Sequence, residues 1–174
     1  MISGSQLVAQ SPTSELLELH ISCVGLADKD TFSKSDPFAT VFLSTNNSPK
    51  TQVGTTEVMK NHLNPIFKKS IPVTYVYEMV QSVTVRVFDQ DEGGDHDFLG
   101  EATFSLASVL MAPPEGYSQQ LILQGKPKGN VRVKYSKIGE SKKLYTFKLN
   151  CTQVKDIEFW SKSDQSNLSN KLKV

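Results

Sequence analysis

Short runs of alternating apolar and polar residues constrain this chain more than any other feature. Leu17, Leu19, Ile21 and Cys23 are separated by single residues, and the same period of two recurs at 83–87 and 131–135. A period of two places alternate side chains on one face of a strand, whereas a helix would need a period near 3.6. The pattern therefore predicts strands that each bury one face.

Further apolar runs and the turns between them extend this pattern along the chain. The runs lie at 38–43, 66–75, 98–106 and 120–123, with Gly, Pro and Asn clusters between them. The helical candidates, 77–82 and 105–111, are one or two turns long. About eight short strands at regular spacing predict an all-β fold, an eight-stranded antiparallel β-sandwich over residues 15–137.

The chain is almost neutral, but its charge is unevenly distributed. It holds 19 Lys and Arg against 18 Asp and Glu, and 12 of the basic residues but only 4 of the acidic ones lie in 120–174. No apolar run approaches the roughly 18 residues of a membrane-spanning helix. Residues 1–14 have no basic start or apolar core of a signal peptide, so we expect a flexible N-terminus and a cytoplasmic location.

The length exceeds the roughly 100 residues that one small β-sandwich needs. A comparison of the chain with itself accounts for the surplus, since a shift of 128 residues aligns 19–36 with 147–164 at six identical positions without a gap. We therefore expect a partial second repeat at 138–164, limited to its first strand and loop, and a disordered tail at 165–174. Cys23 and Cys151 are equivalent in this repeat, which favours two reduced core residues over a disulfide.

Acidic residues cluster in the loop that follows the strand at 83–87. Between Asp89 and Asp97 there are five acids and no Lys or Arg. Asp89 and Asp91 point to one side of the chain, and a glycine-containing turn returns Asp97 toward them. Converging carboxylates without a Cys or His set favour calcium, which prefers 6 to 8 oxygen ligands. A second acidic pair, Asp30 and Asp36, brackets an earlier loop, where a solvated turn is the alternative.

The two loops together resemble those of a C2 domain. The motifs are Asp-x5-Asp-Pro-Phe at 30–38, Asn-Pro-x-Phe at 64–67 and Asp-x-Asp-x5-Asp-Phe-Leu-Gly-Glu at 89–101. Within that family the chain is most similar to the first C2 domain of copines, in the Ser-Asp-Pro at 35–37 and the Thr-Glu-Val at 56–58. The resemblance implies the type II connectivity of the fold, with the start of a second C2 domain after Lys137.

The resemblance also implies a ligand set for two or three calcium ions. Its members are the carboxylates of Asp30, Asp36, Asp89, Asp91 and Asp97, with the main-chain carbonyls of Lys29 and Gln90. Asp95 is either an additional ligand or an acid at the loop tip, and we favour the loop tip. Phe32 is the one apolar wedge in the first loop, and Lys68 and Lys69, placed on the strand after Asn64-Pro65, are further candidates for lipid contact.

In the C2 family such loops bind phospholipid when calcium is present. We therefore expect a cytosolic module that docks peripherally on anionic membranes, with phosphatidylserine or phosphoinositides as ligands, when calcium rises. The alternative is a protein interaction domain, regulated by calcium or not, that binds no lipid. No Gly-x-Ser-x-Gly motif accompanies the three His residues, so we expect no enzymatic activity. Nucleic-acid binding would need a basic face interleaved with aromatic residues, which the pattern does not predict.

Overall fold

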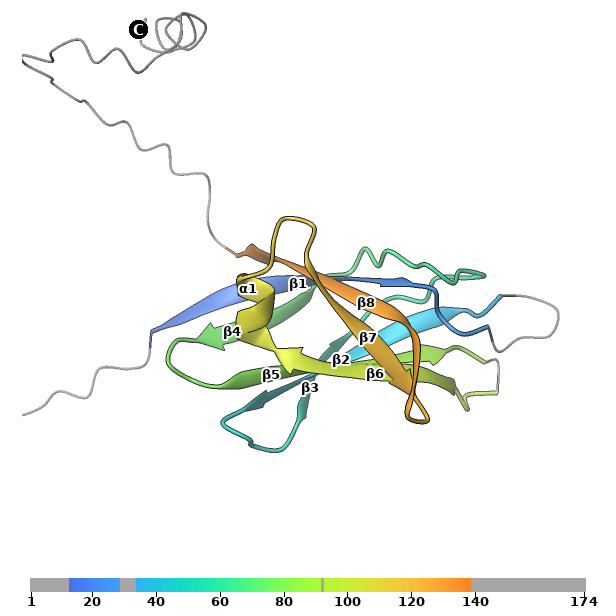
Figure 1. The fold of residues 1–174 in the computed structure, drawn as a ribbon, viewed down its shortest axis with the longest axis horizontal. Helices are drawn as coiled ribbons and strands as arrows, with labels where there is room; N and C mark the ends of the chain where they lie inside the picture. The colour runs from blue at the N-terminus through green and yellow to red at the C-terminus, as the bar shows by residue number, and fades with distance from the viewer. Residues whose placement is uncertain (1–12, 29–33, 92, 139–174) are drawn as a thin grey trace, which may run out of the picture. The chain divides into compact units, whose positions relative to one another are not determined.

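The computed structural model describes residues 13–28, 34–91 and 93–138. These residues form eight antiparallel strands and one short helix (Figure 1). The elements are β1 (Ser14–Val24), β2 (Pro37–Thr45), β3 (Thr51–Thr55), β4 (Ile71–Val76), β5 (Gln81–Asp89), β6 (Asp97–Ser105), α1 (Leu106–Leu110), β7 (Tyr117–Leu123) and β8 (Lys126–Lys137). The predicted eight-stranded antiparallel β-sandwich is confirmed.

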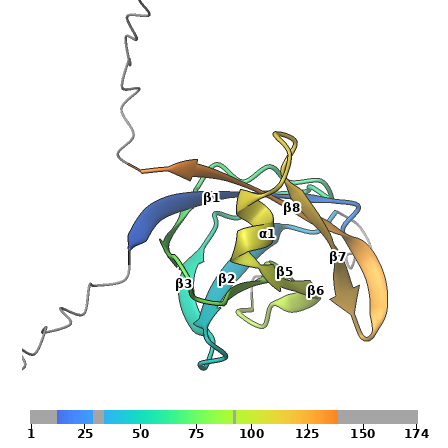
Figure 2. The ribbon, with the colours of Figure 1, turned by 60° about the vertical axis from the view of Figure 1, so that its left-hand side comes forward.

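The strands follow one another laterally in the order β3-β2-β5-β6-β7-β8-β1-β4. The first four form one layer and the last four form the other, and β1 and β8 cross above β2, β5 and β6 in the view of Figure 2. β1 lies between β8 and β4, as the predicted type II connectivity requires. The apolar faces of the two layers therefore face each other.

The layers are joined along β6 and β7 by a single residue pair, Glu101 with Ile122. Gly100 makes this junction fit, because its φ of +139° is unfavourable for other residues and a Cβ would lie 3.3 Å from the Ile122 carbonyl oxygen. The Phe-Leu-Gly-Glu segment thus has a structural role in closing the sandwich, next to the acidic loop.

The core is made by the inward residues of the alternating runs. Leu17, Leu19, Ile21 and Cys23 of β1 are all buried, which confirms the predicted inward position of Cys23. β5 contributes Val83, Val85 and Val87, and β8 contributes Val131 and Val133. Burial of the Cys23 thiol raises its pKa to about 12, so this residue acts as a small apolar side chain.

Two local predictions were wrong. Residues 77–82 are not helical, because Glu78 adopts a φ of +65° in a turn and β5 begins at Gln81. The strand expected from the apolar run at 66–75 begins later than the run, since β4 begins at Ile71 and Ile66 forms only an isolated bridge with Ser22. The helix expected at 105–111 is confirmed over Leu106–Leu110, where Leu106 and Val109 are buried.

Candidate calcium site

Three strand ends bring the predicted acidic residues to one end of the sandwich. Asp36 immediately precedes β2, Asp89 ends β5 and Asp97 begins β6. Figure 1 shows the start of β2, the end of β5 and the start of β6 at the same end of the domain. Asp89 is paired in register with Pro37 on one side and with Asp97 on the other. Antiparallel pairing thus places residues from distant parts of the sequence on neighbouring strands, as the loop pattern predicts for Asp89 and Asp97.

Asp89 is the most firmly held of these residues. Its side chain is buried, with 1% of the residue exposed, and its Oδ1 accepts a 2.5 Å hydrogen bond from the Asp36 amide. The Gln90 amide donates in return to the Asp36 carbonyl at 3.0 Å. These two bonds fix the start of β2 against the end of β5, so the two acidic loops are anchored to each other through backbone groups.

The Asp36 carboxylate is oriented by a third segment. Its Oδ1 accepts a 2.7 Å hydrogen bond from the Asn61 amide, and Asn61 adopts a φ of +54°. The Lys34 amide in turn donates to the Asn61 Oδ1 at 3.3 Å. The connection between β3 and β4 therefore supports the loop that ends at Asp36.

The loop after β5 turns back on itself at a glycine. The Gly94 amide donates to the Asp91 carbonyl at 3.3 Å, and the φ of Gly94 is +86°. The Asp91 amide lies 3.4 Å from the His96 Nδ1. Asp91 is half-buried, whereas Asp95 and Asp97 are exposed, so the acids of this loop differ in their contact with water.

An aromatic cluster lies on the same strand ends as the acidic residues, on the outer face of the layer. The rings of Phe38 and Phe88 stack with centroids 5.5 Å apart, Phe98 lies 5.5 Å from Phe88, and the His96 ring meets Phe38 edge-on at 5.0 Å. Sequence reasoning missed this cluster, although Phe88 precedes Asp89 and Phe98 follows Asp97. These ring contacts join β2, β5 and β6 directly beside Asp89 and Asp97, and such pairs add a modest favourable interaction to the strand pairing.

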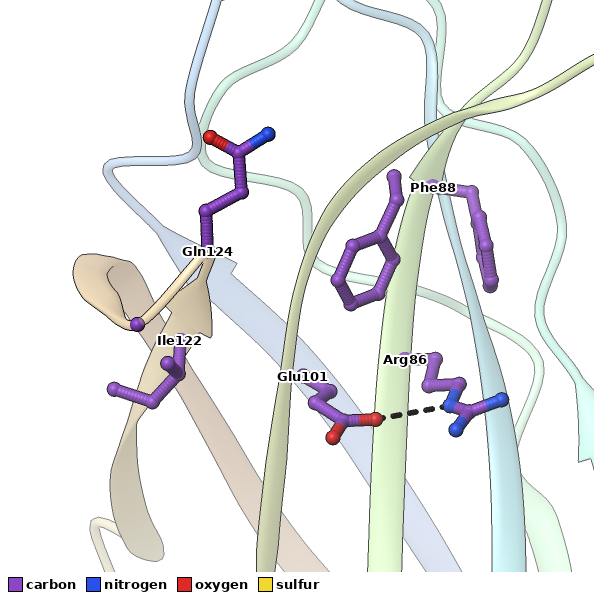
Figure 3. A pocket seen from close by; sticks show the side chains of 7 residues that line it. Arg86, Phe88, Glu101, Ile122 and Gln124 are labelled. Carbon is purple, nitrogen blue, oxygen red and sulfur yellow. Dashed lines mark hydrogen bonds and ion pairs between the residues drawn. The ribbon is translucent and has the colours of Figure 1, made fainter.

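A pocket of about 480 Å³ adjoins the aromatic cluster. Figure 3 shows Phe88, Arg86 and Glu101 on the two neighbouring strands, with Ile122 and Gln124 opposite them. The Arg86 Nε and the Glu101 Oε2 form an ion pair at 2.9 Å. This pairing neutralises the charged lining, so the pocket offers no surplus charge for an ionic ligand.

The remaining predicted residues lie elsewhere or outside the described part of the chain. Lys29, Asp30 and Phe32 fall outside it, as do residues 1–12 and nearly all of the predicted second repeat and tail at 138–174. The prediction that Lys68 and Lys69 lie on a strand was wrong. Both lie in the connection before β4, because the Glu57 carboxylate accepts their amide hydrogens at 2.5 and 3.1 Å.

The described carboxylates near the strand ends are not gathered into one metal-binding cluster. Within 13–28, 34–91 and 93–138, no three Asp, Glu, His or Cys side chains are gathered closely enough to hold one ion. Backbone amides bind Asp36 and Asp89 instead, and like charges repel each other. The donors nevertheless fit calcium chemically, because they are all hard oxygen ligands.

Replacing Glu57 with glutamine is expected to lower the stability of this end by about 1 kcal/mol at pH 7, because one charge-assisted amide contact is lost. Burial raises the pKa of Glu57, but the amide bonds from Lys68 and Lys69 and the Lys68 charge outweigh it and hold the pKa below its usual range. The stabilisation is therefore complete above about pH 4.5 and is lost as the pH falls through the lower folded-state value. Urea unfolding of both proteins at several pH values measures it. A difference that stays constant down to pH 3 would contradict this role.

Comparison with known proteins identifies the fold and a group of similar sequences. Residues 15–123 match the family description of the C2 domain. Copine-A of Dictyostelium discoideum is 38% identical over 140 residues, and Copine-E of the same organism is 32% identical over 139 residues. The matches cover 80% and 76% of this chain but only 23% and 24% of the copines, so the chain spans about a quarter of their length.

Solved structures agree with this match. The BON1-C2B structure has a TM-score of 0.56 and 28% identity, and the alignment covers 77% of this chain and 99% of that one. A calcium-bound structure of two C2 domains of extended synaptotagmin 2 has a TM-score of 0.51 and 24% identity, over 73% of this chain and 47% of that one. Because its identity to this chain is only 24%, the match to extended synaptotagmin 2 supports a shared fold and nothing more. No helix in the described part of this chain is long and apolar enough to cross a membrane.

Proposed function

The chain belongs to the C2 domain family, and from this premise we propose that it is a calcium-dependent module that docks on anionic phospholipid membranes. The observation that carries the proposal is that hydrogen bonds join Asp36, at the start of β2, to the end of β5 at Asp89 and Gln90. Asp89 is buried and bound to the Asp36 amide, and Asp97 begins the neighbouring strand. The bonded Asp89 carboxylate is thereby oriented at the tip of the sandwich, where hard oxygen ligands of the two loops would meet a calcium ion.

The proposed ligands are carboxylate oxygens from both loops and two main-chain carbonyls. The full set is Asp30, Asp36, Asp89, Asp91 and Asp97 with the carbonyls of Lys29 and Gln90, and it would hold two or three calcium ions. Asp36 and Asp89 define the fixed side of the site, because backbone hydrogen bonds hold both. Asp97 and Asp91 have more contact with water and would adjust their side chains to complete it. Asp95 is exposed and remains the weaker candidate.

Bound calcium would supply positive charge at this end of the domain. Without it, the carboxylates of the two loops repel an anionic bilayer. The chain's own contribution is to hold these carboxylates on strand ends, so that the backbone needs little rearrangement when their charge is neutralised. Calcium would thereby control adhesion electrostatically, and phosphate oxygens of phosphatidylserine or a phosphoinositide would bind at the neutralised loops.

Few apolar residues accompany the acidic loops. Phe32 is the proposed wedge of the first loop, and Lys68 and Lys69 are proposed to contact headgroups from the connection before β4, where both are exposed. Binding through these groups would be shallow and sensitive to salt. We propose reversible, peripheral recruitment of a cytoplasmic protein to the plasma membrane or other membranes, without catalysis.

Co-sedimentation with vesicles tests the proposal. The protein is mixed with vesicles of phosphatidylcholine containing phosphatidylserine, in calcium or in chelator, and compared with the Asp89→Asn, Asp91→Asn protein. Wild type is expected to pellet more in calcium than in chelator, and the double variant is expected to pellet no more in calcium than in chelator. Equal pelleting in all four samples would refute the proposal. A rise in Tm with calcium but no vesicle binding would assign the site to a protein interaction domain instead.

A further inference from the structure

The outer surface of the layer that contains β8 and β1 carries a basic face. We define this basic face as Arg132 and Lys134 of β8, His20 of β1, and Lys68 in the connection before β4. Val131 and Val133 are buried, whereas Arg132 and Lys134, which alternate with them along β8, are exposed. The face therefore lies on the solvent side of the layer, away from the hydrophobic core.

Strand register places these residues side by side. Arg132 is paired with Ser118 of β7 and with Ser22 of β1, and Ser22 forms a bridge with Ile66. In the next row along the strands, Lys134 is paired with His20. The Phe67 amide donates to the Ile21 carbonyl at 3.1 Å and Phe67 is buried, so Ile66 and Lys68 lie on its exposed side.

The charges of this face lack partners within the described residues. Arg132 and Lys134 form no ion pair with any of residues 13–28, 34–91 or 93–138. His20 contacts the Ser136 hydroxyl at 2.9 Å. The nearest acids are Glu18, one row further along β1, and Glu115, which precedes the Gly116 that packs against Arg132 and Lys134, and neither forms an ion pair with the face. Glu57 is bound to the amides of Lys68 and Lys69. The centre of the face is therefore positive at neutral pH.

Two exposed apolar side chains lie beside the cationic residues. Ile66 is 73% exposed and lies in the Arg132 row, and Val24 is 48% exposed and is paired with Asn130 in the adjacent row. Val24 is the last residue of β1, directly before the segment that leads to Asp36. The basic face therefore continues, through these apolar residues, toward the acidic end of the domain.

We propose that the basic face is a second contact for anionic phospholipid membrane, which needs no calcium and tilts the docked domain onto its β8–β1 side. A bilayer presents phosphates in two dimensions, and the face presents Arg132 and Lys134 on β8 beside His20 on the neighbouring strand β1. It also offers an apolar layer to Ile66 and Val24. An acidic peptide would satisfy the charges but would leave these apolar side chains without a matching environment. The inference rests on the proposed function.

The test compares a double variant, Arg132→Gln with Lys134→Gln, with a control variant, Lys50→Glu. The control lowers the net charge by the same amount, but at an exposed residue between β2 and β3. Vesicles with and without phosphatidylserine are titrated in chelator at low salt and again in calcium. In chelator, each lost cation is expected to weaken adsorption to phosphatidylserine vesicles by about fivefold. The Lys50→Glu protein should bind like wild type, and in calcium the double variant should also bind more weakly than Lys50→Glu.

Separate outcomes distinguish the two proposals. Equal vesicle binding by the double variant and Lys50→Glu, in chelator and in calcium, would overturn the basic face. Binding of each protein to polyglutamate is measured as a further arm. If the double variant loses binding to polyglutamate while its vesicle binding is unchanged, the basic face is overturned as a membrane contact and an acidic protein partner is favoured. If calcium does not increase vesicle binding by any of the proteins, the proposed calcium-dependent function is refuted. The basic face would still stand, because it is tested by the measurements in chelator. Calorimetric calcium binding without vesicles should be unchanged in the double variant.

Discussion

Replacing Asp89 and Asp91 with asparagine is expected to weaken calcium binding by at least about tenfold, because calcium affinity depends strongly on the number of charged ligands. The Asp89→Asn side chain would keep an oxygen to accept the Asp36 amide hydrogen, so the strand ends should remain in place. Isothermal titration calorimetry without lipid measures the effect. The Tm in chelator should not fall, because the substitution also removes repulsion among the carboxylates.

A matched control removes two charges far from the site. Glu78 and Glu115 are both exposed and lie outside the acidic loops, so Glu78→Gln, Glu115→Gln changes the net charge by the same amount. This control should bind calcium like wild type. Calcium binding that survives in the Asp89, Asp91 variant, or that falls equally in the control, would contradict the proposed ligand set.

Replacing Leu19 with alanine is expected to lower the free energy of unfolding by about 2–5 kcal/mol. Leu19 has no exposed surface and lies on β1 between β8 and β4, so the substitution leaves a cavity at the centre of one layer. Urea unfolding monitored by circular dichroism measures the decrease in the free energy of unfolding. In thermal unfolding, the same substitution should lower the Tm by roughly 10 °C for a domain of this size.

Leu16 provides the internal control for this substitution. It lies on the same strand but is 44% exposed, so Leu16→Ala should change the free energy of unfolding by about 0.5 kcal/mol or less. Similar losses at the two positions would show that β1 does not bury one face in this register. The comparison therefore tests the sandwich independently of calcium or lipid.

The architecture was predictable where the alternation of residues was unambiguous. The inward positions of β1, from Leu17 to Cys23, and those of β5 followed directly from the period of two. The prediction failed at 77–82, where a left-handed Glu78 makes a turn, and at Lys68 and Lys69, whose amides are bound by Glu57. Both failures involve local backbone geometry and contacts between distant segments, which a residue pattern does not contain.

The candidate site was predictable in its residue types but less so in its geometry. The spacing of Asp89, Asp91 and Asp97 indicated a common loop, and the register confirms that Asp89 and Asp97 are partners across β5 and β6. The capture of Asp89 by the Asp36 amide required the fold, since these residues are 53 positions apart. The basic face likewise emerges only when β8, β1 and the bridge at Ile66 are placed side by side.

Calcium control of lipid adhesion can be measured in a reversible vesicle titration. Protein and phosphatidylserine-containing vesicles are sedimented at increasing calcium concentrations, and excess chelator is then added to the calcium-saturated sample. We expect the pelleted fraction to rise with calcium and to return to its starting value after chelation. A pelleted fraction that stays constant throughout the titration, or that does not fall after chelation, would contradict calcium-dependent docking.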